Sequence, residues 1–488
     1  MFARVRTRFA PSPTGYLHIG GLRTALYSYL YAKQNGGDFL LRIEDTDQQR
    51  FVEGAMESLV KVLAVVGLSP DEGVVVDDEN GCNQIGEHGP YIQSQRLEKY
   101  SQAVQQLINN GQAYYCFCTS ERLEQMRAEQ QANNQPPMYD GCCRNLSKDE
   151  VEKRLANGEK HVIRLAVTKN EKIIVNDLVR GEVIFDSNTV DDQVLMKSDG
   201  FPTYHLAVVV DDHDMEISHV IRGEEWLSST PKHVLLYKMF GWELPAFAHL
   251  PLILNKDKSK LSKRQNDVAV EDYLNKGYPI SALINFVALL GWHPSNSEKE
   301  IFTLDELIKE FDPTKIQKAG AVFDQEKLNW LCGKHMQDVD DNLLVDWLKN
   351  KRPEVNDEFA QRFIGVCKNR FNIFDDAVTI YDQLKFVLPS LEDLIYKKST
   401  KESALKGLES ALAVIENFSD QQWLSKDVIA DELKKIINEN LTVGDVFWTT
   451  RVALSGLKTS PPPEELLYVL GREESLNRLH QSLKILQS

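Results

Sequence analysis

The run Arg8-Phe-Ala-Pro-Ser-Pro-Thr-Gly-Tyr-Leu-His-Ile-Gly-Gly21 predicts how the first part of the chain folds. Before the prolines, Val5 to Phe9 predicts a strand, which the Pro-Ser-Pro-Thr-Gly run ends. From Leu22 the apolar residues fall at helical spacing as far as Gly36-Gly37, and Phe39 to Ile43 is a second strand-like run. A nucleotide-binding parallel sheet begins with this strand–turn–helix–strand order.

The turn after the first strand has the composition of a phosphate-binding turn. Gly20 and Gly21 would let the backbone approach a nucleotide closely, and a helix N-terminus favours a polyphosphate. His18, just ahead of the helix, can donate a hydrogen bond to a phosphate oxygen. By itself, a Gly-Gly turn is more often simply a turn.

A second candidate motif is the Lys-rich run Lys256-Asp-Lys-Ser-Lys-Leu-Ser-Lys-Arg264. On its own this run is best interpreted as a solvated basic loop. The functional interpretation places Lys260 and Lys263 against phosphates, where negative charge builds up as pyrophosphate departs.

Length and composition are those of a globular chain with several cores. The 488 residues are enough for roughly three to five packed units. The net charge of −16 argues against indiscriminate nucleic-acid binding, although a local basic patch can still hold one folded RNA. No apolar run approaches the roughly 18 residues of a membrane-spanning helix. The seven cysteines, an odd number, do not resemble a secreted disulfide framework. We therefore expect a cytoplasmic protein that does not enter a membrane.

The residue composition and the apolar pattern change along the chain, and these changes predict an order of domains. Residues 101–200 combine close-set cysteines, a polar segment and strand-like runs, as in an α/β domain inserted into the first sheet. Beyond residue 330 the pattern is helical almost throughout. We expect a doubly wound parallel sheet from 1–100 and 201–255, an insertion at 101–200, a linking domain at 256–335 and an all-helical region at 336–488.

Taken together, the two motifs resemble the signature sequences of class I aminoacyl-tRNA synthetases, His-Ile-Gly-His and Lys-Met-Ser-Lys-Ser. Here they read His18-Ile-Gly-Gly21 and Lys260-Leu-Ser-Lys-Arg264, and glycine in place of the second histidine is typical of the glutamyl branch. The resemblance to bacterial-type glutamyl-tRNA synthetases extends, in chain order, through Arg8–Gly15, Leu41–Asp47, Phe201–His205, Val210–His213, Val220–Trp226, Arg451–Gly456 and Leu470–Arg472.

The resemblance implies a reaction in two steps. L-Glutamate is activated by Mg²⁺-ATP to glutamyl-adenylate, and the glutamyl group then passes to the 3′-terminal ribose of tRNA(Glu), at its 2′-OH in class I enzymes. Activation in this family usually requires bound tRNA, and we expect a monomer. The implied catalytic residues are His18, Lys260 and Lys263, and ATP binding adds Gly20 and Gly21. The insertion would hold the acceptor end of the tRNA and the helical region its anticodon end.

Glutamate carries two carboxylates and one ammonium group, so a selective pocket needs cationic forks and one anion. Arg8, Arg222 and Glu44 match the pocket of the family, with hydroxyls from Ser12 and Tyr204. The alternative is that Glu44 and Arg222 form structural ion pairs. Some relatives have asparagine where this chain has Val208, so one polar contact to the substrate is lost or is supplied by a neighbour such as His205.

A zinc site is predicted in the insertion, since some members of the family hold Zn²⁺ there. Cys116, Cys118 and Cys143 match the cysteines of that site, but Asn145 stands where the histidine would be. The fourth ligand would then be Cys142 or Tyr139. The alternative is a metal-free domain with reduced thiols.

The helical region offers candidate tRNA contacts at Arg451, Lys458 and Arg472, with Trp448 close in sequence. The alternative is that these cations are solvated or ion-paired and that Trp448 belongs to the core.

Five other functions compete with a ligase that attaches glutamate to tRNA(Glu) alone. A glutamine-specific ligase would be expected to end in β-barrels, and a non-discriminating ligase would also charge tRNA(Gln). A nucleotidyltransferase without a tRNA substrate would not need some 150 helical residues, and the shortened paralogues that glutamylate a tRNA base lack them. A non-catalytic tRNA-binding relative would be expected to lose His18, Arg8 or Lys263, and all three are present.

Overall fold

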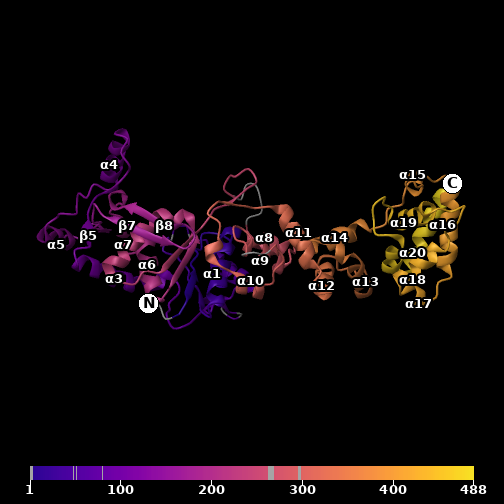
Figure 1. The fold of residues 1–488 in the computed structure, drawn as a ribbon, viewed down its shortest axis with the longest axis horizontal. Helices are drawn as coiled ribbons and strands as arrows, with labels where there is room; N and C mark the ends of the chain where they lie inside the picture. The colour runs from indigo at the N-terminus through magenta and orange to yellow at the C-terminus, as the bar shows by residue number, and fades with distance from the viewer. Residues whose placement is uncertain are drawn as a thin grey trace. The chain divides into compact units, whose positions relative to one another are not determined.

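The computed structural model describes residues 4–47, 49–50, 52–77, 79, 81–261, 269–294 and 298–488. The backbone divides into two compact units, one of Met1–Tyr273 with Leu283–Lys327 and the other of Leu274–Ala282 with Leu328–Ser488. Figure 1 labels many of the helices and strands of both units.

The first unit is built on an eight-stranded sheet with the order β4-β3-β2-β1-β10-β11-β7-β8. Its strands are β1 (Arg6–Phe9), β2 (Asp38–Leu41), β3 (Glu72–Asp77), β4 (Gly81–Ile85), β7 (Lys172–Asp177), β8 (Gly181–Asp186), β10 (His219–Gly223) and β11 (Ala246–Leu250). All pairs from β3 through β7 are parallel, and only the outer pairs β3–β4 and β7–β8 are antiparallel. The strand order reverses between β1 and β10, so the predicted doubly wound sheet is confirmed.

The strand–turn–helix–strand unit predicted from the opening stretch is present. All four residues of β1 are buried, and β1 pairs in parallel with β2. Helix α1 (Ile19–Gln34) begins after His18 and is followed by the Gly36-Gly37 turn. A Cβ on Gly37 would lie 2.0 Å from the carbonyl oxygen of Val5, so only glycine fits between α1 and β2.

The further helices of the first unit are α2 (Ala55–Val65), α3 (Leu97–Asn109), α6 (Tyr204–Asp214), α7 (Thr230–Phe240) and α10 (Leu304–Glu310). Of these, α2 packs on β3 and β4 and α7 packs on β7. Two short helices, α8 (Val270–Asn275) and α9 (Ile280–Ala288), run across the division between the units. A two-stranded parallel sheet joins β12 (Ile253–Leu254) to β13 (Ala321–Val322).

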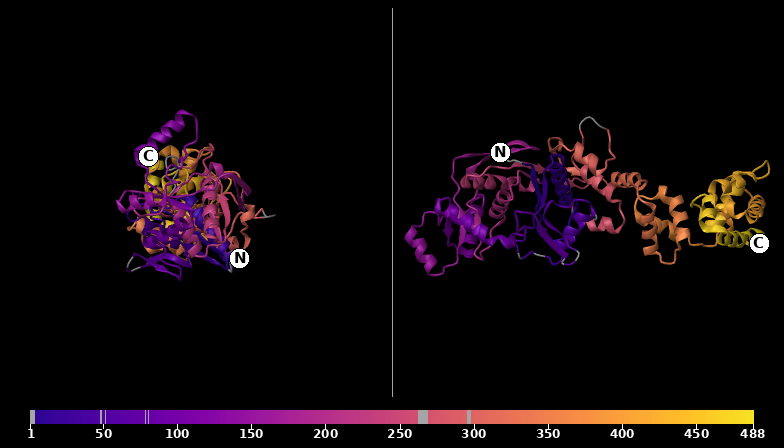
Figure 2. Two further views of the ribbon diagram at one scale, coloured as in Figure 1. Left: turned by 90° about the vertical axis from the view of Figure 1, so that its left-hand side faces the viewer. Right: turned by 90° about the horizontal axis from the view of Figure 1, so that it is seen from below.

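The expected insertion contains a second sheet, made of β5 (Ala113–Cys116), β6 (Val162–Leu165) and β9 (Val194–Met196), which pair antiparallel. Its helices are α4 (Ser120–Ala132) and α5 (Lys148–Ala156), in which no side chain is buried. Figures 1 and 2 show α4 standing away from the rest of this unit. The hairpin β7–β8 departs from the expectation for 101–200, because it extends the large sheet by pairing with β11.

The second unit is helical, as predicted. Its helices are α11 (Gln325–Met336), α12 (Asp341–Lys351), α13 (Asp357–Cys367), α14 (Phe374–Gln383), α15 (Leu391–Leu394), α16 (Lys401–Glu416), α17 (Asp420–Trp423), α18 (Lys426–Lys434), α19 (Thr449–Ser455) and α20 (Pro463–Gln487). A turn of π-helix, Gly444–Trp448, leads into α19, and α20 is interrupted at Gly471, whose φ is 74°. From residue 340 to the last residue, all of them described, there is no strand and hence no β-barrel. The right-hand view of Figure 2 shows this orange-to-yellow segment as helices. Among the described helices of both units, none has the length and apolarity that a membrane span requires.

Candidate active site

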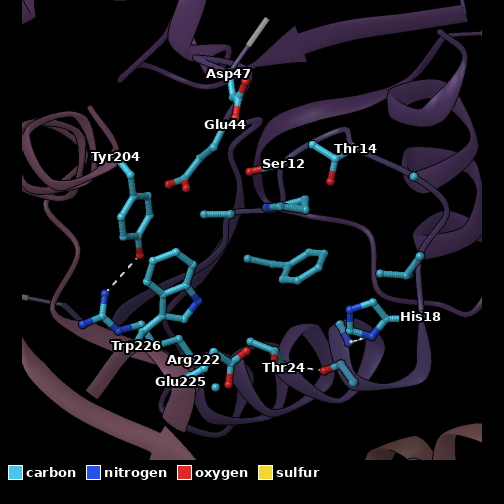
Figure 3. Close-up of a pocket in the computed structure, with 18 of the residues that line it drawn as sticks. Ser12, Thr14, His18, Thr24, Glu44, Asp47, Tyr204, Arg222, Glu225 and Trp226 are labelled. Carbon is cyan, nitrogen blue, oxygen red and sulfur yellow. Dashed lines mark hydrogen bonds between the residues drawn. The ribbon is translucent and has the colours of Figure 1, made fainter. Parts of the chain in front are cut away.

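A cavity of about 960 Å³ opens in the first unit at the carboxyl ends of β1, β2, β10 and β11. This is the edge, beside the point where the strand order reverses, at which doubly wound sheets bind ligands. Residues predicted from the sequence line the cavity: Arg8, Ser12, His18, Gly20, Gly21, Glu44, Tyr204, Arg222 and Lys260. Figure 3 shows Glu44, Tyr204, Arg222 and Trp226 on one side of the cavity and His18 on the other.

The His18 side of the cavity is a helix N-terminus shaped by glycines. Nδ1 of His18 accepts a hydrogen bond from the backbone N–H of Gly21 at 3.0 Å, which caps α1. With Nδ1 as the acceptor, the ring proton of the neutral imidazole is on Nε2. A Cβ on Gly20 would lie 3.0 Å from the His18 ring, so a side chain there would press on the imidazole. The site can therefore offer backbone N–H groups and one imidazole donor to phosphate oxygens.

The Lys-rich loop reaches the same cavity at Lys260, whose side chain is exposed at the rim. Its carbonyl accepts from Nδ2 of Asn255 at 3.3 Å, which attaches the loop to the end of β12. Lys263, the other predicted catalytic lysine, lies outside the described residues. On either side of it, the N–H of Leu261 donates to Ile253 at 3.0 Å and that of Val270 to Leu17 at 2.8 Å.

Arg222 lies at the end of β10 and is only 5% exposed. Its Nε donates to Nε2 of His249 at 3.1 Å, and its Nη2 to Oγ1 of Thr230 at 2.9 Å. Its Nη1 lies 3.1 Å from the hydroxyl of Tyr204 and 3.2 Å from Nδ1 of His233. No carboxylate of the described chain lies within ion-pair distance of this guanidinium. Because a buried charge is costly without a counter-ion, the wall around Arg222 is suited to an anionic ligand.

The histidines around Arg222 are neutral. Burial, followed by the charges of Lys232 and Arg222, lowers the pKa of His205 to about 3. Burial and the charge of Arg222 lower the pKa of His233 well below its usual value. Burial also lowers the pKa of His249, although Asp177 opposes that shift. Arg222 is therefore surrounded by neutral rings, and its positive charge remains available to the cavity.

Arg8, in contrast, already has a carboxylate partner. Its Nε lies 3.0 Å from Oδ1 of Asp212, which also lies 2.8 Å from Nη1 of the fully buried Arg42. Burial raises the pKa of Asp212, and the charges of Arg8 and Arg42 lower it by more. No described residue engages Nη1 of Arg8, so this donor remains for a ligand. The sequence did not reveal the ion pair, because its two members are 204 residues apart.

Glu44 places a buried carboxylate on the same side of the cavity as Tyr204. Its Oε1 accepts from Nη2 of Arg42 at 3.1 Å. Burial raises the pKa of Glu44, and the charges of Arg42 and Arg8 oppose that rise. Figure 3 shows the Glu44 carboxylate pointing toward Tyr204, near Ser12. An ammonium group bound here would relieve the cost of burying the carboxylate.

The sequence missed several residues that line the cavity, among them Trp226, Glu225 and Lys197. The ring of Trp226 packs on that of Tyr204 with centroids 4.3 Å apart. The sequence did contain one signal for Trp226 as a lining residue: it ends the run Gly223-Glu-Glu-Trp226, which directly follows a buried strand. Val208 is 1% exposed within α6 and is not among the residues that line the cavity.

Three cysteines in the insertion lie together with a tyrosine. Sγ of Cys118 is 3.6 Å from Sγ of Cys143, and Oη of Tyr139 is 3.4 Å from Sγ of both Cys116 and Cys118. The three Sγ atoms lie within 4.8 Å of one another. A zinc tetrahedron with Zn–S bonds of about 2.3 Å has sulfur–sulfur edges of about 3.8 Å. Cys142 is exposed and makes none of these contacts. The three thiols and the Tyr139 hydroxyl therefore lie close enough together to fit one zinc ion.

In the second unit, the predicted tRNA-binding residues differ in their surroundings. The guanidinium of Arg451 lies 4.6 Å from the centroid of the Trp448 ring and pairs with no carboxylate of the described chain. Nζ of Lys458 lies 2.6 Å from Asp393, and Nη1 of Arg472 lies 3.6 Å from Asp420. These two are exposed ion pairs of the kind that contribute little to stability, so either cation can exchange its partner for a phosphate.

Family models match both parts of the chain. The model for tRNA synthetases class I (E and Q), catalytic domain, matches residues 4–330. The model for an anticodon binding domain matches residues 341–483.

Individual relatives agree with these matches over full length. The glutamate–tRNA ligase of Finegoldia magna is 45% identical, with 99% of each chain covered. That of Clostridioides difficile is 47% identical, with 97% of this chain and 98% of the relative covered. A crystal structure of a glutamate tRNA ligase from Elizabethkingia meningosepticum, in complex with its amino acid, is 38% identical with a TM-score of 0.87 and covers 99% of this chain and 100% of that one. The chain therefore belongs to the class I tRNA synthetase family of the E and Q type, with an anticodon-binding domain after its catalytic domain.

Proposed function

We propose that this chain is a glutamate–tRNA ligase that activates L-glutamate with ATP and transfers it to tRNA(Glu). The observation that carries the choice of glutamate is Arg222, a buried guanidinium whose side-chain partners are all uncharged. A second carboxylate on the amino acid supplies the missing counter-charge, whereas the amide of glutamine does not.

In the first step the α-carboxylate of glutamate attacks the α-phosphorus of ATP, and pyrophosphate leaves. Glu44 binds the ammonium group of glutamate, while Arg222, Tyr204 and Nη1 of Arg8 bind its side-chain carboxylate. Mg²⁺ enters with ATP and neutralises phosphate charge. His18 and the Gly20-Gly21 backbone hold the phosphates at the N-terminus of α1, and Lys260 and Lys263 stabilise the departing pyrophosphate.

In the second step the 2′-OH of the terminal ribose attacks the carbonyl of glutamyl-adenylate, and AMP leaves. No side chain acts as a covalent nucleophile, because positioning and charge stabilisation carry both steps. The cavity, at about 960 Å³, has room for an amino acid together with a nucleotide. We propose that bound tRNA completes this arrangement before activation begins.

The insertion, in this proposal, carries one structural zinc ion held by Cys116, Cys118, Tyr139 and Cys143. Zinc would hold β5 to the segment that contains Tyr139 and Cys143. The insertion binds the acceptor end of the tRNA, and the helical unit binds the anticodon end through Arg451 beside Trp448, with Lys458 and Arg472. The chain acts as a monomer in the cytoplasm, where tRNA is charged and where thiol ligands stay reduced.

Charging assays with purified tRNA(Glu) and tRNA(Gln), each offered glutamate or glutamine, test the proposal. We expect ATP-dependent attachment of glutamate to tRNA(Glu). Glutamate on both tRNAs would identify a non-discriminating ligase, and attachment of glutamine alone would contradict the assignment.

A further inference from the structure

A chain of buried hydrogen bonds runs from the large sheet to Arg222. Nδ1 of His249 lies 2.6 Å from Oδ2 of Asp177, and both side chains are fully buried. Nε2 of the same imidazole lies 3.1 Å from Nε of Arg222. Asp177 ends β7, His249 lies on β11 and Arg222 on β10, so the relay crosses three adjacent strands. Neither Asp177 nor His249 lines the cavity.

The direction of each hydrogen bond in this relay follows from the two groups at its ends, the Arg222 guanidinium and the Asp177 carboxylate. A guanidinium can only donate, so Nε2 of His249 must be the acceptor. The ring proton is therefore on Nδ1, where it is donated to the carboxylate of Asp177. Protonation of both nitrogens would place a second positive charge and a donor against Arg222.

The carboxylate of Asp177 has no acceptor capacity to spare. Its Oδ2 accepts from the backbone N–H and Nδ1 of His249, at 3.1 and 2.6 Å. Its Oδ1 accepts from the backbone N–H groups of Val179 and Arg180, at 2.9 and 2.8 Å. An asparagine at position 177 would have only one acceptor oxygen. It could therefore accept either from His249 or from the backbone N–H groups of Val179 and Arg180, but not from both.

We propose that Asp177 and His249 are positioning residues for Arg222, which hold its guanidinium toward the substrate without neutralising it. The carboxylate stands one ring away, so it sets the tautomer of His249 but forms no ion pair with the arginine. A carboxylate directly against Arg222 would compete with the substrate for the same donors. This inference rests on the proposed function, because the substrate carboxylate is the ligand for which the charge is kept.

Asp177→Asn tests the role of the tautomer. If the new amide NH₂ faces His249, the ring proton must move to Nε2, where it opposes the Nε–H of Arg222. We expect the KM for glutamate to rise about tenfold or more, with the KM for ATP little changed. His249→Leu, which removes the acceptor altogether, has the same expected effect.

His249→Gln is the conservative rescue, because its amide oxygen can accept from Nε of Arg222 and has no tautomers. We expect its KM for glutamate to stay within about threefold of the wild-type value. When Asp177→Asn is added to His249→Gln, the KM for glutamate should change by less than about twofold. Because Asp177→Asn alone raises it much more, the effects of the two substitutions are strongly non-additive. If Asp177 had a purely structural role, Asp177→Asn would lower the melting temperature equally in the wild-type chain and in His249→Gln. The KM for glutamate would then not be rescued by His249→Gln.

His219→Gln is the matched control. His219 lies on the same strand as Arg222, but its imidazole contacts Tyr31 and Ser218, at 3.3 and 2.8 Å, and not Arg222. It should leave the KM for glutamate unchanged. Wild-type KM values in Asp177→Asn and His249→Leu, or additive costs in the double variant, would overturn the inference. Failure of the wild-type chain to charge any tRNA with glutamate would instead refute the proposed function.

Discussion

The hydroxyl oxygen of Tyr204 lies 3.1 Å from Nη1 of Arg222, and the arginine is the donor in this hydrogen bond. Burial raises the pKa of Tyr204, so its hydroxyl keeps its proton at neutral pH. Because the oxygen accepts from Arg222, the O–H of Tyr204 is left to donate. The two side chains can therefore bind one carboxylate together, the arginine by charge and the tyrosine by a hydrogen bond.

Arg8→Leu should damage both stability and glutamate use. The substitution removes one of the two guanidinium groups that compensate the buried Asp212, while Arg42 remains 2.8 Å away. We expect the free energy of unfolding to fall by about 3 kcal/mol in urea titrations, and the KM for glutamate to rise beyond ordinary concentrations. Arg4→Leu is the control, since Arg4 is exposed in its pair with Asp38. An Arg8→Leu protein with wild-type glutamate affinity would remove Arg8 from the pocket.

His18→Ala should lower the rate of glutamate activation far more than it weakens glutamate binding. A lost contact to the transition state costs roughly 2–4 kcal/mol, measured by ATP–pyrophosphate exchange in the presence of tRNA. His18 also caps α1, so His18→Asn is the matched variant, because asparagine restores a cap without an imidazole. It should recover stability but not rate. Lys263→Ala should slow activation similarly. Variants that activate glutamate at the wild-type rate would exclude these residues from the mechanism.

Acid should destabilise the first unit through its buried histidines. His205 has a pKa of about 3 in the folded state, whereas the unfolded state binds a proton near its usual value of 6.5. Its contribution to stability is therefore complete above pH 6.5 and is lost as the pH falls below that value. Between pH 6.5 and 5, His205→Gln should flatten the pH dependence of the unfolding free energy by about 1–2 kcal/mol. An unchanged pH dependence would show that His205 is not held neutral.

Elemental analysis of the purified chain should find about one zinc ion per chain. Tyr139→Phe should weaken zinc retention against a chelator, because it removes an oxygen that lies 3.4 Å from two of the thiols. Cys143→Ser should do the same. Cys142→Ser is the control, since that thiol is exposed and outside the cluster. Loss of zinc in Cys142→Ser, with retention in Tyr139→Phe, would reverse the assignment of the fourth ligand.

Local patterns predicted the parts of the fold that depend on neighbouring residues. The proline run after Phe9 and the apolar spacing from Leu22 are enough to place β1 and α1, and the motif at His18 follows from them. The hairpin β7–β8 was not separable from the insertion, because its alternating pattern fits either sheet and only pairing with β11 decides between them.

Long-range partners could not be predicted from one sequence. His249 and Asp177 are 72 residues apart, and neither belongs to a sequence motif from which the other could be predicted as its partner. Likewise, spacing left both Cys142 and Tyr139 as candidates for the fourth zinc ligand. Only the folded chain shows that the tyrosine hydroxyl faces the thiols and that Cys142 does not.

In the proposed pocket, the charge of Arg222 selects glutamate over glutamine. Aminoacylation kinetics of the wild-type chain and of Arg222→Gln, with glutamate and with glutamine, test it most directly. Removing one charge-assisted carboxylate contact from a buried site should lower kcat/KM for glutamate about a hundredfold or more and leave the KM for ATP within about twofold. The preference for glutamate over glutamine should shrink by a similar factor. An Arg222→Gln enzyme that kept both its rate with glutamate and its preference would show that Arg222 does not select the substrate.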